Sequence, residues 1–373
     1  MRHDSRRPLA AAILAALAVI VLSPWIGEAR SWLRRAIPGQ FVLTLNIALG
    51  VIAIVALAIA IARIRDRRAI RYGALAAAAG LAALVALDTA SASSAQNAVE
   101  RFHFVEYGLV TALFYRAWRV RGDLSIVCLP LIAGLIVGTL DEAWQWFVPE
   151  RVGEWRDIFI NFGAIGTGLL LSLAIAPPAA FIFGFAPSSW RRVCLAAAVA
   201  VLALAAFMQT VHFGYVVRDD EIGTFRSRYT TEGLLAEGAN RARVWRVTPP
   251  PMTLHRFSRE DQYLAEALWH VRARNDAWAT DVGRAWSENR VLEKYFSPVL
   301  EVRCYLSPDG VKWPDGQRAD AQARAASAPR TRFVSHADPA NFVLVWPRHP
   351  FWAVVSGLIL GLTTAARAEA PRA

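Results

Sequence analysis

Ionisable side chains interrupt apolar stretches of this sequence, and these are the residues whose types and spacing could do chemistry. His103, Glu106 and Tyr107 follow one another at i, i+3 and i+4, which places them on one face of a helix. A charged group at the centre of a membrane costs about 2.5–3.5 kcal/mol on insertion scales, so such residues are functional candidates. His103 and Glu106 are of types that transfer protons or bind a ligand. The alternative is a pair of helix-end residues that hydrogen-bond their neighbours and fix the packing.

The next two apolar segments carry a second group of polar residues. Asp141, Glu142 and Gln145 lie near the end of one segment, and Asp157 and Asn161 lie near the beginning of the next. Carboxylates in this setting could bind a divalent cation or a charged headgroup. Because successive segments cross the membrane in opposite directions, we expect these groups and His103 to meet at the same face of the membrane.

The loop between these two segments contains Arg151, the nearest counter-ion for the carboxylates. The planar guanidinium of arginine can bind carboxylate oxygens in pairs. We favour an Arg151 bridge between Asp141 and Asp157, which would fix the angle between the two helices, over a metal site. The sequence predicts no metal ion and no cofactor.

Enzyme motifs are missing from the sequence. It contains no G-x-S-x-G, no H-E-x-x-H and no phosphate-binding glycine loop, and no activated nucleophile stands out. The three cysteines share no C-x-x-C spacing and predict neither a disulfide framework nor a metal site. A binding function is therefore favoured over catalysis, and His103 and Glu106 stay as candidate bases.

The elements that position these residues follow from composition. Of 373 residues, 55% are hydrophobic and only 19% are charged, which excludes a soluble cytosolic enzyme. A membrane span needs about 17–25 apolar residues. We expect about eight spans, at residues 9–25, 41–62, 72–87, 103–117, 124–148, 158–176, 193–216 and 351–366. The first is interpreted as a retained helix, not as a cleaved signal peptide.

The net charge of +11 comes mainly from arginines at the ends of the apolar segments. Membrane proteins keep more Lys and Arg in cytoplasmic loops. Placing both termini in the cytoplasm puts clearly more arginines on the cytoplasmic side than the opposite orientation does. Nucleic acid is not expected as a partner, because the basic residues act as orientation signals and no nucleic-acid motif is present.

One long stretch, residues 218–348, contains no span and is rich in charges. Ser258 to Asp261 suggests a capping box that opens an amphipathic helix, and a second helix is expected from Asp281 to Phe296. Short strands are expected at residues 299–306, 330–335 and 341–346, with a turn at 307–310. The stretch is predicted to be a small α+β domain outside the cytoplasm. The other expected regions are residues 1–71 (N-terminal spans), 72–176, 177–217 (an interfacial segment and a span) and 349–373 (a last span and a basic tail).

The polar residues resemble a family pattern. Residues 103–107 read HFVEY, residues 141–151 read DEAWQWFVPER, and Asp157, Asn161 and Gly168 follow. This resembles the VanZ-like membrane family over residues 72–176. The sequence departs from the pattern at Glu150, where a small residue is usual, and at Ala164, which replaces a glycine. The resemblance implies a membrane protein linked to glycopeptide susceptibility, without an assigned reaction.

The sequence as a whole predicts an all-α polytopic membrane helix bundle with one small α+β extracytoplasmic domain. We expect it in the bacterial inner membrane, with a polar cavity that faces outward and binds a membrane lipid or a cell-wall precursor. A membrane-embedded hydrolase or transferase that acts on an envelope lipid or cell-wall precursor is the alternative.

Overall fold

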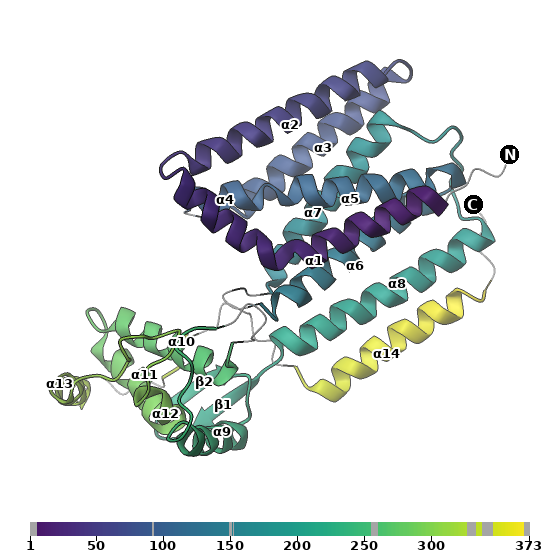
Figure 1. Ribbon diagram of the computed structural model, residues 1–373. Coiled ribbons are helices and arrows are strands. Elements are labelled where there is room, and N and C mark those ends of the chain that lie inside the picture. The colour runs from purple at the N-terminus through teal and green to yellow at the C-terminus, as the bar shows by residue number, and fades with distance from the viewer. Residues whose placement is uncertain are drawn as a thin grey trace. The chain divides into compact units, whose positions relative to one another are not determined.

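The apolar segments form long helices in the computed structural model (Figure 1). The structure describes residues 6–91, 93–148, 151, 153–254, 260–326, 333–337 and 346–368. The chain divides into two compact units. The helical unit comprises Met1–Gln145, Trp155–Phe207 and Arg348–Ala373, and the second unit comprises Trp146–Glu154 and Met208–Pro347.

The helical unit contains the following helices: α1 (Arg6–Ala36), α2 (Phe41–Arg63), α3 (Arg68–Asp88), α4 (Ser94–Glu100), α5 (His103–Trp118), η1 (Arg119–Arg121), α6 (Ser125–Gln145), α7 (Trp155–Ile175), α8 (Pro187–Phe207) and α14 (Arg348–Ala365). Among the described residues, six helices are long and apolar enough to cross a membrane: α1, α2, α3, α6, α7 and α8, the last extended to His212. The expected spans at 103–117 and 351–366 form α5 and α14, which are helical but are not among these six. Their membrane crossing stays a prediction.

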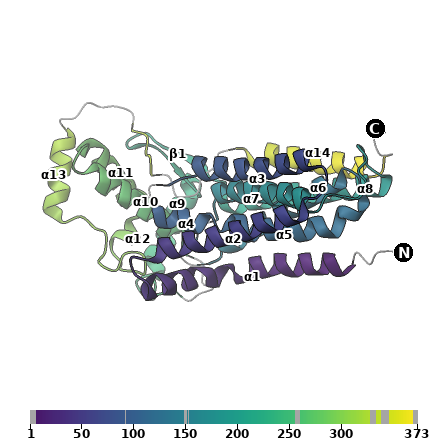
Figure 2. The same cartoon turned by 90° about the horizontal axis from the view of Figure 1, so that it is seen from above.

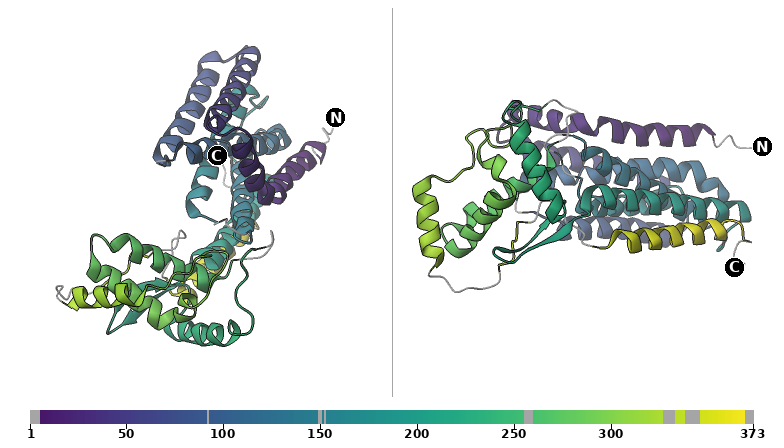
Figure 3. Two further views of the ribbon diagram at one scale, coloured as in Figure 1. Left: turned by 60° about the vertical axis from the view of Figure 1, so that its left-hand side comes forward. Right: turned by 90° about the horizontal axis from the view of Figure 1, so that it is seen from below.

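Helix α7 lies at the centre of the helical unit, where it contacts α3, α5 and α6. Helix α1 packs on α5 and α6, and α14 packs along α8. Figure 2 shows the long helices of this unit running roughly along one direction, and Figure 3 shows α14 beside α8. In consecutive antiparallel helices, the end of one helix lies beside the beginning of the next. The order of the helices therefore decides which polar residues lie close together.

The end of α7 is tied to its neighbours by polar side chains. Arg71 of α3 is buried and donates hydrogen bonds to the carbonyls of Ala174 and Ile175 at 2.8 and 2.9 Å. The Tyr115 hydroxyl donates to the Ala176 carbonyl at 2.7 Å. These bonds satisfy carbonyls that the last turn of a helix leaves without partners, and the arginine charge complements the helix dipole.

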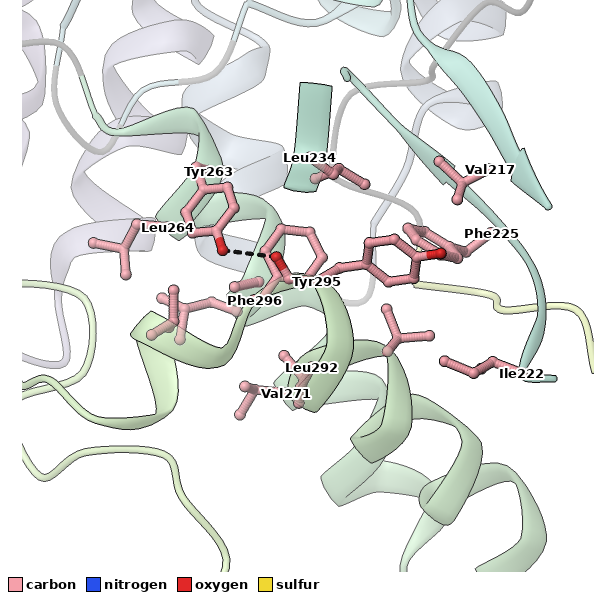
Figure 4. Packing of buried hydrophobic residues seen from close by; sticks show 14 of the residues in the cluster. Val217, Ile222, Phe225, Leu234, Tyr263, Leu264, Val271, Leu292, Tyr295 and Phe296 are labelled. Atoms are coloured by element: carbon pink, nitrogen blue, oxygen red, sulfur yellow. Dashed lines mark hydrogen bonds between the residues drawn. The ribbon is translucent and has the colours of Figure 1, made fainter. Parts of the chain in front are cut away.

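The second unit follows α8 through a π-helical turn, Met208–His212. It contains an antiparallel hairpin, β1 (Tyr215–Asp219) and β2 (Gly223–Ser227), in which Val217 pairs with Phe225. Its helices are α9 (Thr231–Val244), α10 (Gln262–Ala277), α11 (Val282–Tyr295), α12 (Ser297–Leu300) and α13 (Asp315–Ala326). The hairpin, α9, α10, α11 and α12 enclose a hydrophobic core, part of which Figure 4 shows, with the Tyr263 hydroxyl bonded to the Tyr295 carbonyl. A second, smaller cluster packs Ala321 of α13 against Ala277, Ala285 and Trp313.

The helices of the second unit begin where the sequence places capping residues. The Asp261 side chain accepts hydrogen bonds from the backbone N–H groups of Tyr263 and Leu264, so α10 begins directly after it. Asp281 caps α11 in the same way, which confirms the second expected helix. Ser258 lies outside the described residues.

Other local predictions for this unit were wrong or incomplete. The expected strand at 299–306 is wrong, because Ser297–Leu300 forms α12, with Pro298 in its first turn, and irregular backbone follows. The turn at 307–310 is confirmed by a bond from Gly310 N to Ser307 O. Within 330–335, the described residues pair with β2 through Thr224 and Val334. The expected strand at 341–346 lies outside the described residues except for Trp346. The β1–β2 hairpin was not anticipated, and the expected span at 193–216 extended into it.

Candidate functional site

Three helices of the helical unit bring their polar ends together. Helix α5 begins at His103, α6 ends at Gln145 and α7 begins at Trp155. Each of the three helices contacts the other two. Because α6 runs opposite to α5 and α7, its last turn lies beside their first turns. The residues that the sequence singled out lie on these ends, apart from Arg151.

Hydrogen bonds connect the polar residues of α5 and α6. Tyr107 Oη donates to Asp141 Oδ2 at 2.8 Å. Gln145 Nε2 donates to the same oxygen at 2.9 Å and to Glu142 Oε1 at 3.0 Å. All four side chains are buried, with at most 4% of the residue exposed. Since Gln145 follows Asp141 by four residues and Glu142 by three, one helical turn brings its amide to both carboxyl groups.

Asn161 enters this cluster from α7. The residue is 1% exposed and lies against Gly138 of α6, where an added Cβ would stand 3.2 Å from Asn161 Cβ and 3.5 Å from the Tyr107 ring. Among the described residues, neither the amide nitrogen nor the amide oxygen of Asn161 has a hydrogen-bond partner. A buried polar group without a partner costs about 1–3 kcal/mol. Asn161 therefore offers a donor and an acceptor to a molecule that enters the cluster.

The second carboxyl oxygen of Asp141, Oδ1, also has no hydrogen-bond partner in the described part of the chain. Ser23 of α1 lies near Asp141. Its hydroxyl, however, gives its single proton to the Ile20 carbonyl at 3.1 Å. Asp141 thus has one oxygen held by Tyr107 and Gln145 and one that can accept a further hydrogen bond.

His103 and Glu106 lie on the first turn of α5, and both are half-buried. The His103 ring stacks on the Tyr107 ring with centroids 5.8 Å apart and planes within 2°. His103 Nδ1 has no hydrogen-bond partner among the described residues. Parallel stacking directs the Tyr107 hydroxyl toward Asp141 and not toward the imidazole, so the pair is not an activated nucleophile and base.

Arg156 forms an ion pair that the sequence analysis missed. Its Nη1 and Nη2 contact the two oxygens of Glu100 at 2.8 and 2.9 Å, and Nη2 also donates to the Thr89 carbonyl. Asp157 lies 3.5 Å from Nη1. The pair ties the start of α7 to α4. The only signal for it in the sequence is an acidic residue just before His103 and a basic residue beside Asp157.

The Arg151 bridge to Asp141 and Asp157 stays a prediction. Arg151 belongs to the second unit, whereas both carboxylates belong to the helical unit. Glu150 lies outside the described residues.

Close helix contacts hold the cluster in place. An added Cβ at Gly168 of α7 would stand 2.6 Å from Gly108 Cα of α5, and one at Gly134 of α6 would stand 2.8 Å from the Ile165 side chain. A larger residue at Gly168 would require the helix backbones to move apart, and one at Gly134 would require the Ile165 side chain to shift. The Gly134–Gly138 face of α6 receives a neighbouring helix at close range, and that helix is α7.

The arrangement can bind a polar group but provides no metal centre within the described residues. No group of three or more His, Cys, Asp or Glu side chains is placed there to hold a metal ion. The free hydrogen-bonding atoms of Asn161 and Asp141 suit a ligand with both hydroxyl or amide donors and an acceptor oxygen.

A second buried polar group lies inside the second unit. His270 Nδ1 of α10 is 2.8 Å from Glu288 Oε2 of α11, and both residues are fully buried. The Ser335 hydroxyl donates to the other Glu288 oxygen at 2.7 Å. Arg274, one turn after His270, donates to Asn289 Oδ1 at 3.0 Å and to a backbone carbonyl at 2.7 Å. Burial lowers the pKa of Arg274 to about 10.

The sequence analysis missed this group, although a signal was present. Glu266, His270 and Arg274 recur every four residues along α10, which predicts a polar stripe beside the apolar one. In a soluble helix such a stripe is usually exposed. Here it is covered by α11, by the chain after β2 that bonds Glu266, and by Val311 and Trp313, which contact Arg274. Burial raises the pKa of Glu266 above its ordinary value.

Comparisons of the chain with protein-family models, with curated proteins and with solved structures give no match.

Proposed function

We propose that this chain is a multi-pass membrane protein, similar to VanZ-like proteins, whose polar cluster on α5, α6 and α7 binds the head of an envelope lipid or lipid-linked cell-wall precursor. The observation that carries the proposal is Asn161, a fully buried amide without a partner among the described residues. Beside it, Asp141 Oδ1 can accept a hydrogen bond. A headgroup with hydroxyl or amide groups would satisfy all three atoms, and its acyl chain would remain in the membrane.

The family resemblance supports the same site. The residues that carry it, from His103 to Tyr107 and from Asp141 to Gln145, include those that form the hydrogen-bonded cluster. A residue pattern that serves only helix packing would not need an amide and a carboxyl oxygen without partners. A link to glycopeptide susceptibility belongs to this proposal, because those antibiotics bind cell-wall precursors.

The proposal includes an orientation in the bacterial inner membrane. About eight spans, with α5 and α14 among them, place both termini in the cytoplasm and residues 218–348 outside it. The arginine distribution supports this orientation. A phosphatase fused after Leu300 should be active, and activity of a cytoplasmic reporter at the same position would overturn the orientation together with the outward-facing site.

The binding test is mass spectrometry of lipids that remain with the purified protein after gentle extraction. The wild type should retain one lipid class in excess, and Asn161→Leu and Asp141→Asn should lose it. Asn46→Leu is the matched control, because Asn46 is an exposed amide in α2 that is far from these contacts in the sequence. If all four proteins retain the same lipids, the cluster does not bind a headgroup.

The alternative is a membrane-embedded hydrolase or transferase. The observation that favours it is His103 Nδ1, which has no hydrogen-bond partner in the described part of the chain. In that case the wild type would convert a lipid-linked precursor, and His103→Ala and Glu106→Gln would retain the precursor unchanged. Equal conversion by His103→Ala and the wild type would reject His103 as the base.

A further inference from the structure

Helix α1 is longer than a membrane crossing requires. Its 31 residues extend over about 46 Å at 1.5 Å per residue, whereas the hydrocarbon core is about 30 Å thick. Pro24 lies inside the helix. Proline removes a backbone hydrogen bond and bends a helix, and α1 changes direction along its length in Figure 1. The part before Pro24, Arg6 to Ser23, has 18 residues, which lies within the range of about 17–25 residues for a membrane span.

The part after Pro24 is amphipathic. At about 3.6 residues per turn, its apolar residues fall on one continuous face: Trp25, Ile26, Ala29, Trp32, Leu33, Ala36 and Ile37. The opposite face carries Glu28, Arg30, Ser31, Arg34 and Arg35. No residue of one kind falls within the arc of the other. This pattern is typical of a helix that lies in a membrane interface.

The first part of α1 has one covered face and one exposed face. Ala12 and Ala16 are buried and pack in a core cluster with Tyr107, whereas Leu14 is 67% exposed. In the second part, Trp32 is 63% exposed and Ile26 is 38% exposed. Part of the apolar face of the second part is thus exposed, directly after a segment that is long enough to end at a membrane surface.

The charges of the polar face identify what covers this region. Arg30, Arg34 and Arg35 outnumber Glu28, so the helix is complementary to an anionic surface. We propose that residues 25–37 lie in the membrane interface, with Trp32 and Leu33 at the acyl boundary and the arginines on the phosphates of anionic phospholipid.

The placement can be tested by spin-label accessibility in the full chain. Single cysteines would replace residues 31–36 in a protein whose own Cys128, Cys194 and Cys304 are changed to alanine, in nanodiscs that contain phosphatidylglycerol. Labels at Trp32, Leu33 and Ala36 should collide mainly with oxygen, which partitions into lipid. Labels at Ser31, Arg34 and Arg35 should collide mainly with a water-soluble nickel chelate. A profile without helical period, or exclusion of both reagents from the apolar face by protein, would overturn the proposal.

The preference for anionic lipid is tested separately. The protein is reconstituted in vesicles of phosphatidylglycerol and phosphatidylcholine, and the ratio of the two lipids that remain with the purified protein is measured. Arg34→Gln with Arg35→Gln should lower the preference for phosphatidylglycerol about fivefold per arginine. Arg34→Lys with Arg35→Lys, the matched control, should preserve it, because a lysine keeps the charge. An unchanged preference in the glutamine variant would show that these arginines do not bind the anionic headgroup.

Discussion

Two buried polar groups, one in each unit, differ in which of their atoms are paired. In the second unit, both oxygens of Glu288 have partners, from His270 and Ser335, and Arg274 has both side-chain and backbone acceptors. His270 Nε2 and Glu266 Oε1 have no partner among the described residues. In the helical unit, Asn161 has no partner for either amide atom among the described residues, although it is buried as deeply. A paired network holds a fold together, whereas an unpaired buried amide costs stability that a ligand can restore.

The surroundings of the two groups differ. Glu288 joins α10 to α11 and to the chain segment that returns past β2, and each of its oxygens has a partner there. In the cluster on α5–α7, hydrogen bonds link α5 to α6, and no described residue supplies a partner for Asn161 on α7. The first group is expected to be structural and the second to be available for binding. The following predictions test that distinction, from the largest expected effect to the smallest.

Glu288→Ala should destabilise the second unit by about 3–5 kcal/mol, because it removes the partner of His270 Nδ1 and the acceptor of the Ser335 hydroxyl and opens a cavity. Hydrogen exchange of peptides from α10 and α11 in the full chain should become faster. Peptides from α6 and α7 should keep their exchange rates.

The control for this change is Glu301→Ala. Glu301 pairs with Lys312 at 2.7 Å, but both side chains are more than half exposed. An exposed pair adds little to stability, so the exchange of α10 and α11 should hardly change. Equal effects of the two variants would mean that the buried network does not hold the unit together.

The same contrast explains what the sequence could predict. Asp141 and Glu142 stand out in the sequence because a charged residue inside an apolar segment is unusual, whichever neighbour the segment packs against. The polar residues of the cluster on α5–α7 could therefore be selected from the sequence. The Glu266–His270–Arg274 stripe was not selected, since polar residues in a soluble helix give no sign of burial. The sequence also did not predict the partner of Val334, which pairs with Thr224. That partner lies over a hundred residues earlier in the chain.

A double-mutant cycle should distinguish the contribution of Arg156, in α7, from that of Arg151. Arg156 contacts Asp157 at 3.5 Å, so Arg156→Ala and Asp157→Asn should be coupled by about 0.5–3 kcal/mol in thermal unfolding in detergent. The same cycle with Arg151→Ala tests the predicted bridge. If the losses from Arg151→Ala and Asp157→Asn simply add, Arg151 does not bind Asp157, and Arg156 alone neutralises the start of α7.

The stability of the second unit should depend on pH in two opposite ways. Burial raises the pKa of Glu266, so the folded state holds its proton more tightly, and stability decreases as pH rises above about 4.5. For Asp219, burial is outweighed by Lys294, Tyr295 and two backbone N–H groups, which lower its pKa. Stability from Asp219 is therefore lost as pH falls below about 3.8.

Two variants check these signs through hydrogen exchange of α10, corrected for the intrinsic effect of pH. Glu266→Gln should remove the decrease above about pH 4.5, and Asp219→Asn should remove the loss in acid. A steeper decrease with rising pH in Glu266→Gln would show that Glu266 is charged and stabilising in the folded unit.

Asn161→Leu is expected to change stability least. This small effect tests directly whether the cluster on α5–α7 differs from the network around Glu288. Leucine has a similar shape to asparagine and fits beside Gly138, while it removes two buried polar atoms that lack partners among the described residues. Replacing an unpaired amide by an apolar group of the same shape is nearly neutral or stabilising. In detergent stripped of lipid, Asn161→Leu should therefore unfold within about 0.5 kcal/mol of the wild type, or later. Added headgroup ligand should stabilise the wild type by mass action and leave the variant unchanged. A loss of several kcal/mol without ligand would mean that the amide is paired after all, and that this cluster, like that around Glu288, is part of the framework.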